Sequence, residues 1–208
     1  MGGYAPQSEP AVVLPARPCQ VPAQFRAFLN GLLQEQAMGF RIRRAVPQDS
    51  AAVRRLVARS LLGHGPEVGH SERLEVALDR VVGRDWEPFA KGTYFLVEQG
   101  TRVLGIGGYA PSGRPFGTAR MRHFYVDPEF SRQGIGSWLL TVAEGRALTE
   151  GFRSADCVAM LNGEQFFGAN GYLPVDHTAA TLPGGWLSRG LRMRKNLASA
   201  VRAQPSVA

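Results

Sequence analysis

A strand, a tight glycine loop and a helix follow one another from Val126 to Leu140, VDPEFSRQGIGSWLL. An Asp-Pro pair ends the apolar run at Val126, and Gly134 and Gly136 stand where a helical pattern begins. Glycine permits a turn with positive φ and a close approach of a bulky anion. The first N–H groups of a helix lack internal acceptors and carry the positive end of its dipole, so the corner suits a phosphate or pyrophosphate. The glycines could equally serve the turn alone, and both interpretations stay open.

The spacing after this corner predicts a helix that stops at Gly151. Residues at i, i+4, i+7, i+8 and i+12 form one apolar face: Ile135, Leu139, Val142, Ala143 and Ala147. Ser137, Thr141 and Glu144 fall on the opposite side of the same helix.

The composition describes a globular chain of ordinary size. Its 208 residues, 44% hydrophobic and 20% charged, suffice for one full core plus extensions. No apolar run approaches the roughly 18 residues of a membrane span and no leader pattern opens the chain, so we expect a cytoplasmic protein with no membrane partner. Cys19 and Cys157 give neither a disulfide framework nor metal-ligand spacing, which predicts free thiols, a core position for Cys157 and no metal site.

The positive charge is almost entirely arginine. The formal net charge is +7, and Lys91 and Lys195 are the only lysines. A basic balance can indicate nucleic acid, a membrane surface or a small anionic ligand. The arginines are scattered rather than striped, which favours a solvated surface, and we predict no nucleic-acid partner.

The pattern divides the chain into three parts. Residues 1–37 are dense in proline and glycine and are expected to form a partly disordered extension, with a short amphipathic helix possible at 24–36. Residues 38–197 form the predicted domain, and 198–208 a flexible tail. An alternative is that the functional chain starts at Met38.

The domain alternates strands and helices in a regular order. Strands are predicted at 40–44, 93–98, 102–109, 119–126, 157–161, 175–181 and 187–195, and helices at 47–61, 71–81, 135–151 and 162–170.

This order resembles the general N-acetyltransferase (GNAT) superfamily through three local matches between Phe40 and Asn196. SRQGIG after Val126-Asp127-Pro128 is similar to the acyl-CoA motif, and the run Phe166 to Tyr172, FFGANGY, to the C-terminal aromatic motif. The hairpin GTYFLVEQGTRVLGIGGYAP and the end TLPGG with RMRK resemble a small bacterial acetyltransferase subgroup.

The resemblance implies an α/β (α+β) GNAT-type three-layer fold. It implies a mixed central sheet of about seven strands, splayed between the fourth and fifth, with helices on both faces. It further implies an enzyme, an N-acetyltransferase that uses acetyl-CoA as acyl donor and a small primary amine as acceptor, by direct sequential attack, as a monomer or homodimer. The alternative is a catalytically degenerate acyl-CoA sensor or interaction module. A dinucleotide enzyme built on Gly105, Gly107 and Gly108 is disfavoured because no helix follows those glycines.

The resemblance also assigns the cofactor contacts. The pantetheine arm would pair with main-chain groups of the fourth strand at Phe124, Tyr125 and Val126. The pyrophosphate would be held by the corner, at Arg132, Gln133, Gly134, Ile135, Gly136 and Ser137. Asn162 would lie near the mouth of the splay, and Phe167 near the thiol.

Several positions depart from the family pattern. Ser131 stands where Arg or Gln is usual, with Arg132 next to it, and Phe167 replaces a tyrosine that protonates the thiolate in many relatives, which a phenyl ring cannot do. Arg120 and Arg122 stand where relatives place a base. They share one face of their strand and are predicted to bind a carboxylate or phosphate of the acceptor. The equal alternative is that both make structural salt bridges with neighbouring helices.

Three histidines are candidates for the reaction or the acceptor. His123 is expected on the face opposite the arginines, beside Met121 and Tyr125, and is the candidate base, against the alternative of a core histidine. His70 lies with His64 in the loop between the first two helices, which rims the acceptor site in relatives, and is a candidate acceptor-binding residue. The alternative for both loop histidines is plain surface.

A chain that starts at Met38 should keep its melting temperature within a few degrees. Four prolines between Pro10 and Pro22 interrupt any pairing with the sheet, and losing an uncoupled segment costs roughly 0.5 kcal/mol or less. Scanning calorimetry of both chains measures this. A fall of about ten degrees or more would instead show that the apolar face of 24–36 docks on the domain.

Overall fold

The computed structural model describes residues 39–63, 78, 91–113, 115–160, 163–181 and 187–198. Seven strands form one sheet in the order β1-β2-β3-β4-β5-β7-β6. The strands are β1 (Phe40–Arg44), β2 (Tyr94–Gln99), β3 (Arg102–Pro111), β4 (Thr118–Val126), β5 (Ser154–Ala159), β6 (Leu173–Thr181) and β7 (Leu187–Asn196). The α-helices are α2 (Ser50–Leu62), α5 (Ile135–Thr149) and α6 (Gly163–Ala169), and short 3-10 turns occur at η1 (Pro47–Asp49) and η3 (Pro128–Phe130).

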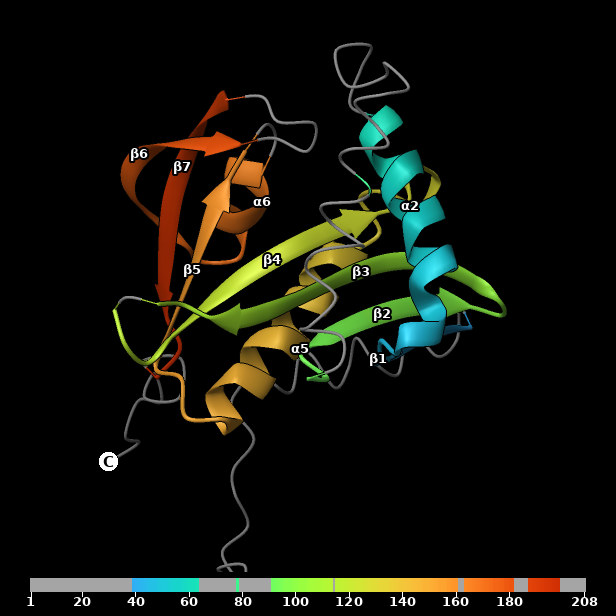
Figure 1. Cartoon of the computed structure of the whole chain (residues 1–208), viewed down its shortest axis with the longest axis horizontal. Helices are drawn as coiled ribbons and strands as arrows, with labels where there is room; N and C mark the ends of the chain where they lie inside the picture. Colours follow the sequence, from blue (N-terminus) through green and yellow to red (C-terminus); the bar gives the residue numbers. More distant parts are fainter. Residues whose placement is uncertain are drawn as a thin grey trace, which may run out of the picture.

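The sheet is antiparallel except between β4 and β5. These two strands run parallel, and their ladder consists of three pairs, of which Arg120↔Asp156 is the last. From there the strands diverge, so the sheet opens like a V (Figure 1). The predicted mixed sheet with a splay between the fourth and fifth strands is confirmed.

Helices cover both faces of the sheet (Figure 1). On one face, α2 packs Val53, Leu56 and Val57 against Leu96 and Ile106 of β2 and β3. On the other face, α5 buries Ile135, Trp138, Leu139, Leu140, Ala143 and Ala147 beneath the sheet. Burying each large aliphatic side chain contributes roughly 1.5–3 kcal/mol, so these two layers hold the fold together. We call them the α2 face and the α5 face of the sheet.

The apolar spacing of α5 is confirmed, but its buried side is broader than the sequence pattern indicates. Glu144, placed on the opposite side by that pattern, is only 13% exposed and accepts a 2.7 Å hydrogen bond from Lys195 of β7. Burial raises the pKa of Glu144, although the charge and hydrogen bond of Lys195 oppose that rise. The C-terminal half of β7 therefore covers a flank of α5 that local periodicity cannot reveal.

A bulge interrupts β4 where it pairs with β3. Arg122 pairs with Gly108 and Tyr125 with Ile106, so His123 and Phe124 together oppose Gly107. His123 takes a left-handed conformation with φ 58°, which costs a residue with a side chain about 1–3 kcal/mol. Only glycine fits at position 107, because a Cβ there would lie 2.5 Å from the Phe124 ring.

The bulge corrects one placement predicted from the sequence. His123 was expected on the face opposite Arg122, beside Met121 and Tyr125. Met121 does pack into the α5 core, but Tyr125 packs against the α2 core, and His123 contacts Tyr94 and Tyr125. The extra residue reverses the alternation of side chains, so His123 lies on the α2 face.

The other predicted elements agree with the structure apart from their ends. Strand β5 starts at Ser154, three residues before its predicted start. Leu78, predicted on the inner face of the second helix, is helical and 3% exposed. The proposed extension at 1–37, the rest of that helix and the tail from 199 lie outside the described residues. No helix in the described ranges has the length and hydropathy needed to cross a membrane.

Asp127 joins the end of β4 to two other elements. Its side chain is 1% exposed and lies 2.9 Å from Arg59 Nη2 of α2 and 2.8 Å from Arg102 Nη2 of β3. Burial opposes ionisation, but the hydrogen bonds from Arg102 and the Glu129 N–H, with the charge of Arg59, hold the pKa of Asp127 below its usual value. This carboxylate fixes the strand end from which the glycine corner departs.

Replacing Asp127 with Asn should lower the free energy of unfolding by about 1–3 kcal/mol, because a buried charge-assisted set of hydrogen bonds is weakened. Urea denaturation measures the loss. The contribution of the depressed pKa is full above the unfolded pKa of about 3.9 and disappears as the pH falls through the lower folded value, so the difference from wild type should shrink below about pH 4.

The matched control is Glu129→Gln, which removes a 70% exposed carboxylate from the same Arg102. Exposed pairs contribute about 0–1 kcal/mol, so this variant should unfold almost like wild type. Equal losses in the two variants would contradict a special role for Asp127.

Candidate active site

The glycine corner stands at the wide end of the V. Ser131, Arg132, Gln133 and Gly134 are exposed between η3 and α5. Arg132 and Gly134 have positive φ values of 66° and 85°, which turns the chain so that α5 starts at Ile135. The exposed start of a helix directs unsatisfied N–H groups outward, so this corner can hold an anion.

The two glycines of the corner have different structural tasks. A Cβ on Gly134 would meet nothing within 4 Å, so the positive φ is what this position requires. A Cβ on Gly136 would lie 3.1 Å from the Phe166 ring of α6 and 3.6 Å from Val126 Cγ2. Gly136 therefore lets α6 and the end of β4 pack against the first turn of α5.

Asn170 ties the end of α6 to the corner. Its amide Nδ2 donates to Ser137 Oγ at 3.1 Å and to the Phe166 carbonyl at 2.8 Å. The bonds place α6 beside the first turn of α5. Ser137, predicted at the pyrophosphate, thus lies at the helix start as expected, with its hydroxyl bound to a side chain.

Aromatic rings close the α5 side of the V. Phe124 of β4 lies 6.1 Å and 6.0 Å from the ring centroids of Phe166 and Phe167, and Phe167 lies 5.2 Å from Tyr172. Phe167 is 7% exposed, which makes it part of the core wall. Burial first, and the charge of Glu144 second, raise the pKa of Tyr172 far above its usual value, so its hydroxyl stays protonated.

A histidine and two tyrosines meet at the bulge on the α2 face. His123 Nδ1 lies 2.7 Å from the Tyr94 hydroxyl of β2, and the His123 ring stacks on Tyr125 at 6.4 Å and 12°. Tyr94 is fully buried, whereas His123 is half-buried. Burial raises the pKa of Tyr125 to about 12, so that hydroxyl is also protonated near neutrality.

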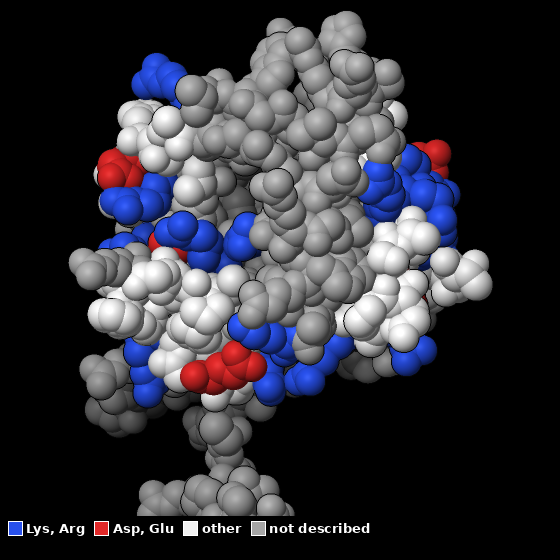
Figure 2. Space-filling model, viewed as in Figure 1, with Lys and Arg blue, Asp and Glu red and all other residues white. Residues whose placement is uncertain are grey.

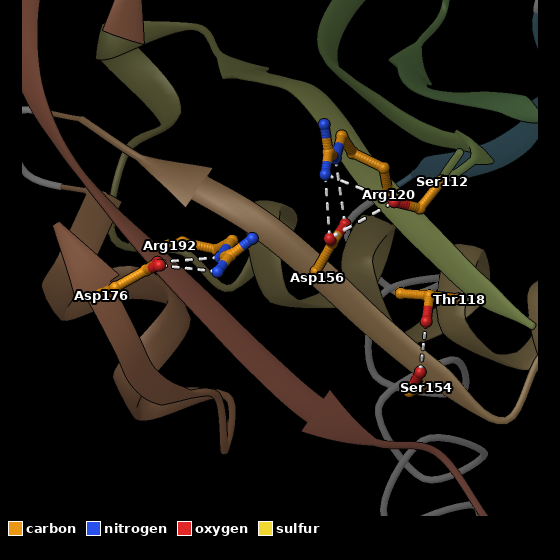
Figure 3. Close-up of polar contacts among 7 residues, drawn as sticks. All are labelled: Ser112, Thr118, Arg120, Ser154, Asp156, Asp176 and Arg192. Atoms are coloured by element: carbon orange, nitrogen blue, oxygen red, sulfur yellow. Dashed lines mark hydrogen bonds and ion pairs between the residues drawn. The ribbon is translucent and has the colours of Figure 1, made fainter. Parts of the chain in front are cut away.

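An ion pair joins β4 to β5 where the V closes (Figure 3). Arg120 donates from Nε and Nη2 to the two oxygens of Asp156, both at 3.0 Å, and from Nη2 to Ser112 at 3.3 Å. Asp156 is 1% exposed and Arg120 40% exposed. Arg120 therefore makes a structural salt bridge, which was the alternative prediction for it. Its partner lies on a neighbouring strand and not on a helix.

A scan against protein-family models places residues 64–165 in the family described as "Acetyltransferase (GNAT) family". This segment belongs to the GNAT acetyltransferase family. It is accordingly an acyltransferase, as the resemblance predicted. None of the curated proteins matches the chain.

Solved structures share the fold of this GNAT domain. PaiA N-acetyltransferase from Thermoplasma acidophilum, solved with coenzyme A, is 14% identical at TM-score 0.59, over 76% of this chain and 98% of that one. YncA from Salmonella typhimurium, solved with its cofactor acetyl-CoA, is 19% identical at TM-score 0.58, over 82% and 99%. The loading GNATL domain of CurA from Lyngbya majuscula is 13% identical at TM-score 0.61, over 77% and 98%. At identities this low, the structural likeness shows a shared fold and nothing more.

The GNAT domain brings together most of the side chains predicted from sequence. The corner, the strand segment Phe124 to Val126 and Phe167 surround the V, whereas Arg120, Arg122 and His123 belong to its α2 face. Asn162 and His70 lie outside the described residues. No group of three or more His, Cys, Asp or Glu side chains able to hold a metal occurs in the ranges that the structure describes.

Sequence reasoning missed Tyr94, Asp156 and Asp127 as parts of this site. A carboxylate in the middle of the apolar strand SADCVAM was a usable signal for Asp156, because a buried charge needs a partner. Tyr94 gave no such signal, since its partner His123 is 29 positions away.

Proposed function

We propose that this GNAT domain transfers the acetyl group of acetyl-CoA to the primary amine of a small acceptor. The observation that carries the proposal is that the V between β4 and β5 opens beside a glycine corner at the start of a helix. A pantetheine arm needs an unpaired strand edge, and a pyrophosphate needs converging N–H groups. In this chain a Cβ added to Gly136 would lie 3.6 Å from Val126 Cγ2, so the corner lies beside the end of β4.

Acetyl-CoA as donor fits both halves of this arrangement. Past Arg120, the described part of β4 has no ladder pair with β5, so main-chain groups at Phe124 to Val126 would pair with the pantetheine arm. The N–H groups from Gln133 to Ser137 would hold the pyrophosphate, with Arg132 beside them. Two of the similar structures were solved with coenzyme A or acetyl-CoA, which supports the same donor here.

Direct transfer is the route that the side chains favour. The amine nitrogen attacks the thioester carbonyl carbon, the C–S bond breaks, the nitrogen loses a proton, and the leaving thiolate takes one up. An acyl-enzyme would need an activated nucleophile. Burial raises the pKa of Cys157 to about 12, and this thiol is 1% exposed in the α5 core, so it is unsuited to that task.

His123 is the proposed proton acceptor. With Nδ1–H donated to the Tyr94 oxygen, Nε2 is the nitrogen that accepts the proton of the amine. Tyr94 is then a positioning residue, because its buried hydroxyl fixes the ring and tautomer of His123. The strained φ of His123 fits this role, since such conformations cluster at functional sites.

A binding module without turnover is the second candidate. Phe167 favours it, because the position that would protonate the thiolate carries no proton donor. Binding of acetyl-CoA without thiol release on any amine would select the module.

Calorimetry should detect acetyl-CoA binding to the purified full chain, and thiol release should follow when amines are added. Gly134→Ala should weaken acetyl-CoA binding about tenfold or more, because it strains the turn that aims the N–H groups. Its matched control is Gly151→Ala at the other end of α5. Both glycines have positive φ, 85° and 93°, and open space for a Cβ, so both variants should lose a similar amount of stability, about 1–2 kcal/mol.

The Gly151 variant should bind acetyl-CoA like wild type. Equal affinities in the two variants would remove the corner from the cofactor site. No binding at millimolar acetyl-CoA would end the proposal as a whole.

His123→Gln should lower kcat by about a hundredfold or more and leave the acetyl-CoA dissociation constant unchanged, because general base catalysis contributes roughly 10²–10⁴-fold. The same substitution should also abolish the acidic limb of the pH profile, which is the fall of kcat/KM at low pH. Tyr94→Phe keeps the ring and removes the hydroxyl, so it should shift that limb while costing less in kcat. An acidic limb that survives unchanged in His123→Gln assigns the base elsewhere.

A further inference from the structure

A row of alternating charges crosses three strands at the closed end of the V. Arg120 of β4 pairs in register with Asp156 of β5, and Asp156 pairs with Arg194 of β7. Residues opposite each other in a ladder share a face. Met193, next to Arg194, is buried in the α5 core, so the row lies on the α2 face.

A second row lies two residues farther along. Val158 of β5 pairs with Arg192 of β7, and Arg192 with Asp176 of β6. Arg192 donates to both oxygens of Asp176 at 2.8 Å and 2.6 Å (Figure 3). Arg122 is the residue of β4 two positions beyond Arg120, on the other side of the opening.

The two rows carry an excess of positive charge. Among the described residues of the two rows there are four arginines and two aspartates, Arg120, Arg122, Arg192, Arg194, Asp156 and Asp176, a net charge of 4 − 2 = +2 for these members. Lys and Arg side chains gather in one area of this face of the molecule (Figure 2). In the view of Figure 1 the same area holds β4, β5 and β7.

Arg194 is the member whose hydrogen bonding is incomplete. Arg120 and Arg192 are each held by a carboxylate through two nitrogens. Arg194 Nε is buried and has no hydrogen-bond partner among the described residues. A buried guanidinium nitrogen without a partner is costly, and an anionic ligand would satisfy it.

We propose that the acceptor amine also carries a carboxylate or phosphate, which Arg194 binds, with Arg122 facing it across the V. The inference rests on the proposed function, because it assigns the acceptor class of the same site. A guanidinium binds both anions through two parallel hydrogen bonds. The row at Arg120 and the bulge at His123 are three residues apart on β4, which places the anion toward the closed end and the amine toward His123.

The same charges exclude another class of acceptor. A polyamine would bring several positive charges beside arginines, and like charges at such distances repel. The arginines thus select the acceptor in two ways, by attracting an anionic amine and by repelling a polyamine.

The test compares acceptors that differ only in the anion. The pairs are 4-aminobutyrate with butylamine, for a carboxylate, and phosphoethanolamine with ethanolamine, for a phosphate. We measure kcat/KM by thiol release at saturating acetyl-CoA. Wild type should prefer the anionic member of at least one pair about tenfold or more, and the preferred pair identifies the anion.

Arg194→Gln should lower kcat/KM for the anionic acceptor about ten- to hundredfold and change the uncharged partner less than about threefold. Arg194→Lys, which keeps the charge, should retain part of the preference. The control is Arg146→Gln, an exposed arginine of α5 on the other face of the sheet, which should change neither acceptor. Raising the salt concentration with wild type should weaken the preference without any substitution.

One further readout separates this inference from the proposed function. Calorimetry with phosphoethanolamine and 4-aminobutyrate, in the presence of coenzyme A, reports acceptor binding without turnover. Binding that is lost in Arg194→Gln supports the anion site even where no thiol is released. Equal preference within each pair, a polyamine as best acceptor, or equal losses for both members in Arg194→Gln would overturn it.

Discussion

The ion pair between Arg120 and Asp156 stands where the sheet stops being continuous. Three parallel pairs join β4 to β5, and the last of them carries a carboxylate that is 1% exposed. A buried carboxylate is tolerated only with partners, and here the guanidinium and Ser112 supply them. The pair fastens the two halves of the sheet at one end, which lets the other end stay open for a ligand.

The positions of the glycine corner and of the side chains at the open end depend on how β4 ends and bends. Asp127 fixes the strand end through Arg59 and Arg102, so the glycine corner departs from a rigid point. The bulge at His123 moves Phe124 into the α5 layer and His123 to the α2 face. One extra residue thereby separates an apolar wall from a polar side of the V.

Local sequence signals were sufficient for the elements and for their order. The periodicity of α2 and α5, the glycine corner and the hairpin of β2 and β3 were all recoverable, because they depend on residues within a few positions of one another. The splayed fold itself came from a resemblance to GNAT proteins, since no spacing in the chain states which strands pair.

The sequence by itself determined which segments are strands, which are helices and where the chain turns at Gly134. Tertiary structure alone decided that Glu144 meets Lys195, that Asp156 holds Arg120, and that His123 meets Tyr94. Each of these contacts joins residues 29 to 51 positions apart. Local periodicity carries no information about such pairs, and the bulge that turned His123 to the α2 face arises only when β4 aligns with β3.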